Sequence, residues 1–166
     1  MKKIDQRGIT LVELLAVIAI SSALLAVGYS ILFSMIKSAE YSTAQTKLRN
    51  ESILITQQFD QAMLNIDSIE IVGEPDPDGK FQFFQAIDKQ PAEDNSDQVQ
   101  TVVIPFKISA EGKLLINNKQ INSDEYSLKR TTFKQVNGNL QVYYVIDDLN
   151  SHEQFTLFKN YKLQSE

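Results

Sequence analysis

Glu13 is the residue near the start of the chain whose charge most needs a chemical explanation. It is a single carboxylate, and no charged side chain follows it from Leu14 to Ile36. A charge near the middle of a membrane helix costs about 2.5–3.5 kcal/mol, and less near an end. Glu13 therefore needs a partner, and a functional role is the first hypothesis for a charge in such a segment. The alternative is a plain acidic residue in the first turn of a helix, where the positive end of the helix dipole favours it.

Other candidates for catalysis are few. The chain has no cysteine and one histidine, His152, which lies in the polar stretch from Asp147 to Glu153. A Ser–His–Asp site would have to use this histidine, and we expect instead a solvated turn residue. The six glycines are scattered, so no phosphate-binding glycine loop is present. The sequence thus predicts no enzyme and no cofactor.

Two further groups could bind ligands. Spaced carboxylates from Glu74 to Gly79 resemble part of a calcium loop, but the EF-hand spacing is absent, so a plain loop is expected and calcium remains the alternative. A basic and aromatic group could contact DNA; it comprises Lys129, Arg130 and Lys134 with Phe133 and Tyr126. The net charge of −5 opposes binding to phosphates, so direct nucleic-acid binding is not expected.

The uncharged segment is long enough to cross a membrane. As a helix it would measure about 35 Å, against a bilayer core of about 30 Å. It is too long for the apolar core of a secretory signal and has no small-residue cleavage site after it. Lys2, Lys3 and Arg7 precede it, whereas Lys37 and Glu40 cancel after it. The positive-inside rule places the N-terminus in the cytoplasm and the bulk of the chain outside.

The stretch Arg7-Gly8-Ile9-Thr10-Leu11-Val12-Glu13, preceded by Lys2 and Lys3, resembles the N-terminal motif of type IV pilins and type II secretion pseudopilins. The resemblance implies that prepilin peptidase cuts between Gly8 and Ile9 and methylates the new N-terminus on Ile9. Glu13 is then the fifth mature residue, as in the family. Isoleucine stands where the family usually has phenylalanine. The resemblance covers residues 1 to about 36.

Cleavage would expose an ammonium group on Ile9. Ile9 and Glu13 are four residues apart and share a helix face, so the two charges can neutralise each other within a chain or between neighbours. The resemblance implies an intermolecular pair that sets the register of a filament. Small residues recur at every fourth position and could serve helix packing, although they are also common in membrane helices; they are Ser22, Ala26, Ser30 and Ser34.

The elements that carry these residues form an α+β layout. We expect one helix from about Thr10 to Ile66, apolar all round in its first half and amphipathic in its second half, packed on a C-terminal antiparallel sheet of pilin type. Strands are expected at 69–71, 81–87, 99–108, 113–116, 119–121, 126–136, 140–146 and 154–163, the last with a change of phase. Pro105 suggests an edge or a bulge, and residues 89–97 suggest a surface loop. Asn117-Asn118 and Asn137-Gly138 are hairpin turn signals.

The expected organisation has four parts: a leader at 1–8, a transmembrane or filament-core helix at 9–36, an amphipathic helix at 37–67 and a β domain at 68–166. The resemblance implies a minor pilin, PilW-like or of the J-type pseudopilins, in a pilus, competence or type II secretion filament. Its partners would be the membrane, prepilin peptidase and other pilin subunits. It would reside in the cytoplasmic membrane, single-pass, and reach the cell surface after assembly. The alternative is a membrane-anchored binding domain that does not polymerise.

Overall fold

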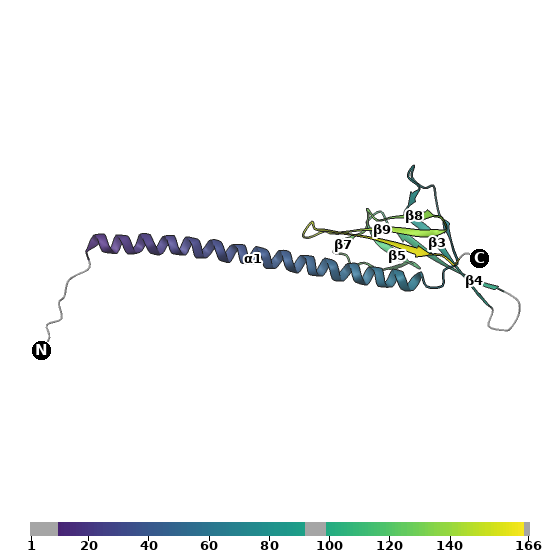
Figure 1. Ribbon diagram of the computed structural model, residues 1–166, viewed down its shortest axis with the longest axis horizontal. Coiled ribbons are helices and arrows are strands. Elements are labelled where there is room, and N and C mark those ends of the chain that lie inside the picture. The colour runs from purple at the N-terminus through teal and green to yellow at the C-terminus, as the bar shows by residue number, and fades with distance from the viewer. Residues whose placement is uncertain (1–9, 92–98, 165–166) are drawn as a thin grey trace. The chain divides into compact units, whose positions relative to one another are not determined.

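The computed structural model describes residues 10–91 and 99–164. The chain divides into two compact units, Met1–Thr43 and Ala44–Glu166. One helix, α1 (Leu11–Ala62), supplies residues to both units, and the β-strands belong to the second (Figure 1). This is the expected α+β architecture, a long N-terminal helix with antiparallel sheets.

The helix ends earlier than expected. We expected it to reach Ile66, but α1 stops at Ala62 and a turn occupies residues 63–65. The amide of Met63 donates to the carbonyl oxygen of Phe59 at 2.9 Å, and Asn65 adopts a left-handed conformation with φ 66°. Asparagine tolerates this conformation better than most residues, and it commonly terminates helices. The sequence predicted a longer helix because Met63 and Ile66 continue its apolar spacing. Both are buried in the core although they lie beyond the end of α1.

The strands form two antiparallel sheets. The first has the order β1-β3-β4-β5-β6, with β1 at Ser68–Ile71, β3 at Phe83–Pro91, β4 at Val99–Ile108, β5 at Leu114–Ile116 and β6 at Lys119–Gln120. The second has the order β10-β9-β8-β2, with β10 at Gln154–Lys162, β9 at Asn139–Asp148, β8 at Thr132–Val136 and β2 at Lys80–Phe81. A short strand, β7 (Tyr126–Ser127), also pairs with β9.

The hairpin turns form where asparagine and glycine predicted them. Asn117 and Asn118 have φ values of 50° and 62° between β5 and β6. Asn137 and Gly138 have φ values of 51° and 75° between β8 and β9. Two successive residues at positive φ are the signature of type I′ turns, whose twist matches that of the flanking strands.

Three strand predictions were wrong in detail. The run 81–87 is not one strand, because it divides at Gln82 between β2 in the second sheet and β3 in the first. The run 126–136 divides into β7 and β8, with a turn closed by the Thr131 amide donating to the Leu128 carbonyl at 2.8 Å. The expected phase change in 154–163 is absent, since β10 alternates without interruption and leaves Phe158 exposed.

Two smaller expectations concern β4 and its neighbour. Pro105 lies inside β4, between β3 and β5, and its carbonyl accepts the amide hydrogen of Asn117 at 2.9 Å, where β5 ends. Pro105 therefore lies just beyond the residues of β4 that pair with β5. Its missing N–H costs no hydrogen bond within that ladder, and a strand can tolerate a proline at such a position. The loop expected at 89–97 begins later, because β3 continues to Pro91. Its remaining residues lie outside the described part of the chain.

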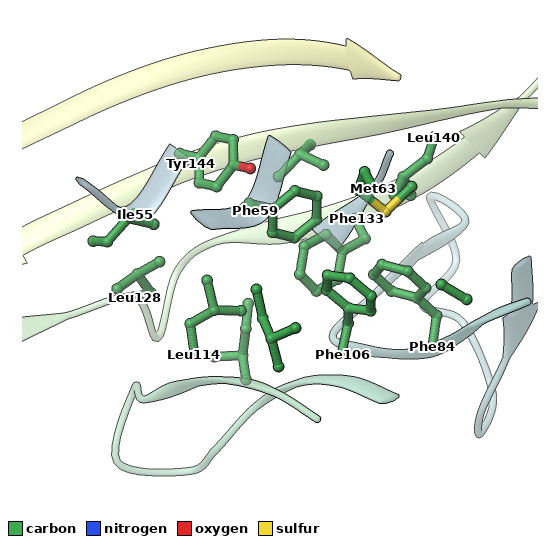
Figure 2. Packing of buried hydrophobic residues seen from close by; sticks show 14 of the residues in the cluster. Ile55, Phe59, Met63, Phe84, Phe106, Leu114, Leu128, Phe133, Leu140 and Tyr144 are labelled. Atoms are coloured by element: carbon green, nitrogen blue, oxygen red, sulfur yellow. The ribbon is translucent and has the colours of Figure 1, made fainter. Parts of the chain in front are cut away.

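The core of the second unit is built around Phe59 of α1. Its ring centroid lies 5.0 Å from that of Phe106, 5.9 Å from Phe133 and 5.7 Å from Tyr144 (Figure 2). Phe106 belongs to the first sheet, whereas Phe133 and Tyr144 belong to the second. All four rings are fully buried. The helical residue thus joins the two sheets into one core. Its contacts with Phe106 and Tyr144 are edge-to-face and that with Phe133 is stacked, and such aromatic pairs add to the hydrophobic gain.

A polar network fixes the same part of α1 to β10. Lys159 Nζ lies 2.6 Å from Asp60 Oδ2, and the Tyr161 hydroxyl donates to Asp60 Oδ1 at 2.7 Å. The hydroxyls of Tyr161 and Tyr144 are 3.1 Å apart. Burial is the main reason why the pKa values of both tyrosines are raised. Both tyrosines are neutral at physiological pH, as tyrosine ordinarily is, and they act as hydrogen-bonding groups.

Candidate functional site

The N-terminal end of α1 is closed by a reciprocal pair, Thr10 and Glu13. The Thr10 amide and hydroxyl donate to Glu13 Oε2 at 2.9 and 3.0 Å. The Glu13 amide donates in return to Thr10 Oγ1 at 3.3 Å. A Ser or Thr with a Glu three residues later is the capping box, which satisfies amide hydrogens that a helix start leaves without partners. The sequence carried this signal, yet only the acidic first-turn position of Glu13 was recognised from it.

The capping box uses one of the two carboxylate oxygens of Glu13. Both bonds from Thr10 end on the same oxygen, Oε2. In the part of the chain that the structure describes, Oε1 accepts no hydrogen bond. A carboxylate offers about four acceptor sites, so it can cap the helix and still accept bonds from an ammonium group. Capping and charge pairing are compatible roles for this side chain.

Beyond the cap, the first part of α1, up to Thr43, has an entirely exposed apolar surface. Every residue from 10 to 43 is exposed, and Leu11, Leu25 and Tyr29 keep 77%, 74% and 74% of their surface. Among the described residues, α1 is the helix that is long and apolar enough to cross a membrane. An apolar surface of this extent requires lipid or other helices around it. This exposed apolar surface supports a single-pass membrane anchor.

Two serine hydroxyls of this segment donate hydrogen bonds to carbonyl oxygens of their own helix. Ser22 Oγ donates to the carbonyl oxygen of Ala19 and Ser30 Oγ to that of Val27, each at 2.9 Å. Neither hydroxyl therefore needs a partner outside its own helix, which makes both compatible with lipid. At the end of the uncharged run, Lys37 Nζ lies 4.7 Å from the centre of the Phe33 ring. The packing role of the small residues stays a prediction.

The cleavage junction itself, Gly8 and Ile9, lies outside the described residues. The comparison with protein families bears on it through the sequence. Residues 4–29 match the family model described as the prokaryotic N-terminal methylation motif. This match supports the type IV pilin and pseudopilin family. The motif implies processing by a peptidase and association with other pilins in the membrane. A search of curated proteins gave no match, and neither did a search of solved structures.

The remaining candidates from the sequence occupy surface turns. His152 is exposed, has φ 60°, and its amide donates to the Asp148 carbonyl at 3.0 Å. Asp76 Oδ1 accepts the amide hydrogens of Asp78 and Lys80 at 3.0 and 2.7 Å, so this carboxylate closes its own loop. Within residues 10–91 and 99–164, no group of three acidic, histidine or cysteine side chains is placed to hold a metal ion.

The basic and aromatic group expected from the sequence does not exist as a surface. Phe133 and Tyr126 keep 0% and 4% of their surface, so neither can stack on a ligand. Phe133 points inward because β8 alternates, which places its neighbour Lys134 on the outer side. Both residues of β7 are buried, Tyr126 among them, and Lys129 and Arg130 lie exposed in the turn between the two strands. Arg130 and Lys134 are exposed, and they lie beside a different aromatic pair, Tyr143 and Phe158. The sequence did not reveal this pair, because the phase of β10 was misread.

Proposed function

We propose that the chain is a minor pilin or pseudopilin, a structural subunit of a short filament. Prepilin peptidase cuts between Gly8 and Ile9 and methylates Ile9, and the subunit enters the filament through α1. The observation that carries the proposal is the match of residues 4–29 to the methylation motif. The exposed apolar surface of α1 supports it, since the same surface serves lipid before assembly and neighbouring helices afterwards.

In this proposal Glu13 gains a second role on cleavage. It caps α1 through Thr10 in the precursor. After cleavage its carboxylate also accepts hydrogen bonds from the ammonium group of Ile9, in its own or a neighbouring chain. An ion pair in lipid is far less costly than a lone charge. When neighbouring subunits are in the correct axial register, the ammonium group of Ile9 lies beside the carboxylate of Glu13. A wrong register leaves both charges without partners. The N-terminus starts in the cytoplasm, and the β domain lies outside the cell membrane and on the cell surface after assembly.

The filament would belong to a competence, type IV pilus or type II secretion system, and the subunit itself would not catalyse a reaction. The alternative is a single-pass anchored binding domain that does not polymerise. Mechanical shearing of the native host distinguishes the two. A filament subunit is released into the sheared fraction, and its release requires both the prepilin peptidase and the assembly ATPase. A protein found only in the membrane fraction, with or without those enzymes, would support the anchored domain.

A further inference from the structure

The outer surface of the second sheet carries two exposed aromatic rings side by side. Tyr143 on β9 and Phe158 on β10 keep 54% and 52% of their surface. They are direct partners in the register of the two strands, and their ring centroids lie 6.3 Å apart at an angle of 54°. Most aromatic side chains of this unit are in the core, so an exposed pair on the edge strand β10 and its neighbour β9 marks an interaction surface.

Basic residues surround the two rings. Lys134 on β8 pairs in register with Lys80 on β2, and Arg130 precedes β8. These five residues are called here the basic aromatic face: Lys80, Arg130, Lys134, Tyr143 and Phe158. With Thr132, Gln141 and Val145 they line a shallow depression of about 440 Å³. Its volume suits a few side chains of a partner.

The charge of this face is opposite to that of the protein. The chain as a whole carries −5, whereas three cations gather here with two neighbouring carboxylates, which leaves a local excess of positive charge. Arg130 is paired with Asp147, and Lys80 lies 3.1 Å from Asp78. Lys134 forms no ion pair with any acidic side chain that the structure describes. An anionic partner therefore complements the face, and Lys134 is the cation that is available to form a new ion pair with it.

The arrangement favours a peptide over a nucleic acid. Single-stranded nucleic acid needs rings on which successive bases stack and several cations for its phosphates. Here the rings are inclined by 54°, and two of the three cations already have carboxylate neighbours. An acidic peptide with one large apolar side chain needs less: the apolar side chain covers the rings, and a carboxylate reaches Lys134. Aromatic residues and arginine are the common anchors of such interfaces.

We propose that the basic aromatic face binds an acidic peptide segment of a partner protein, with an apolar side chain of the segment seated on Tyr143 and Phe158. This proposal does not depend on cleavage or filament assembly, because all five residues belong to the second unit.

The test uses the full chain in nanodiscs of zwitterionic lipid, so that lipid charge does not contribute. The probe is a fluorescein-labelled glutamate-rich peptide with one central phenylalanine, and binding is followed by fluorescence anisotropy. We expect Lys134→Glu and Tyr143→Ala each to weaken binding roughly tenfold, the scale of one buried anchor or charge pair. Lys119→Glu and Leu149→Ala are matched changes at exposed sites off this face, and they should change the affinity less than about twofold. Circular dichroism confirms folding of each variant.

Two altered peptides, single-stranded oligothymidylate and added salt serve as controls that identify the chemistry. Replacing the phenylalanine of the peptide by alanine, or its glutamates by lysines, should abolish binding. Added salt should weaken it. The proposal is overturned if the acidic peptide does not bind at millimolar concentration, if the variants on the face bind it as well as the wild type does, or if single-stranded oligothymidylate binds more tightly than the peptide.

Discussion

The two residues of the capping box allow the structural and electrostatic roles of Glu13 to be separated. Thr10→Ala removes the hydroxyl that bonds Glu13 at both ends but keeps the carboxylate. Glu13→Gln keeps an acceptor at the capping position, since glutamine also serves there, but removes the charge. Glu13→Ala removes both. The three variants differ by a few atoms at one helix end.

The expected sizes follow from these contacts. Loss of the capping residue costs about 1 kcal/mol, which increases fraying of the first turn about fivefold and leaves the charge pair intact. Loss of the carboxylate leaves the Ile9 ammonium without its partner in lipid. The cost of a lone charge is about 2.5–3.5 kcal/mol at the centre of a bilayer and less near an end, so incorporation should fall about tenfold or more.

The assay is quantitative immunoblotting of sheared and membrane fractions from the native host. All three variants should insert and be processed. Thr10→Ala should enter filaments nearly as the wild type does, whereas Glu13→Gln and Glu13→Ala should remain in the membrane. Normal incorporation of Glu13→Gln would refute the charge-pairing role of Glu13. The same role is refuted if Thr10→Ala is as defective as Glu13→Gln, because the cap would then be the whole function of Glu13.

Three further predictions concern the second unit. Phe59→Ala should lower the free energy of unfolding by about 3–5 kcal/mol, whereas Leu54→Ala, 53% exposed on the same helix, should change it by less than about 1 kcal/mol; chemical denaturation measures both. Gly112→Ala should also destabilise the fold, because Gly112 has φ +79° and an added Cβ would lie 2.9 Å from the Lys129 amide nitrogen. Thermal unfolding measures the effect, and Gly73→Ala, at a position where an added Cβ meets no atom within 4 Å, is the control. Burial opposes ionisation of Asp148, but the amides of Asn150 and Ser151 prevail and lower its pKa. The carboxylate therefore stabilises the fold above the ordinary aspartate pKa of about 3.9, and this contribution is lost as the pH falls through the lowered value. Asp148→Asn should flatten the dependence of unfolding free energy on pH in that acidic range, and an unchanged slope would contradict this assignment.

Much of the fold followed from local patterns. The uncharged segment and the amphipathic stripe predicted α1 almost to its end, because helix periodicity is written in consecutive residues. The turns at Asn117-Asn118 and Asn137-Gly138 were predictable, since few residue types accept positive φ. These features depend on the backbone preferences of two or three residues, so the sequence alone was sufficient for them.

The misread features depend on contacts between distant segments. Phe81 and Phe83 lie two residues apart, yet Phe81 pairs with Phe133 in the second sheet and Phe83 with Lys107 in the first. No local pattern distinguishes one strand from two strands that separate at Gln82. Phe158 looked like a core residue by its type, but the register with Tyr143 places it on the outer surface. The basic aromatic face could not be predicted for the same reason.

The candidate site was predicted better than the β domain because its signal is local. Glu13 was selected by the register of the N-terminal motif, and the match over residues 4–29 supports that motif. The capping box was not predicted, although Thr10 and Glu13 stand three residues apart in the sequence. The junction at Gly8 and Ile9 stays a prediction from the sequence.

The N-terminus of the mature protein tests the central claim most directly. Mass spectrometry of the protein purified from its host should find a chain that begins at Ile9 and carries one methyl group on its amine. Deleting the prepilin peptidase should restore a chain that begins at Met1. A protein that still begins at Met1 in cells with an active peptidase would contradict the account, because the ammonium partner proposed for Glu13 would never form.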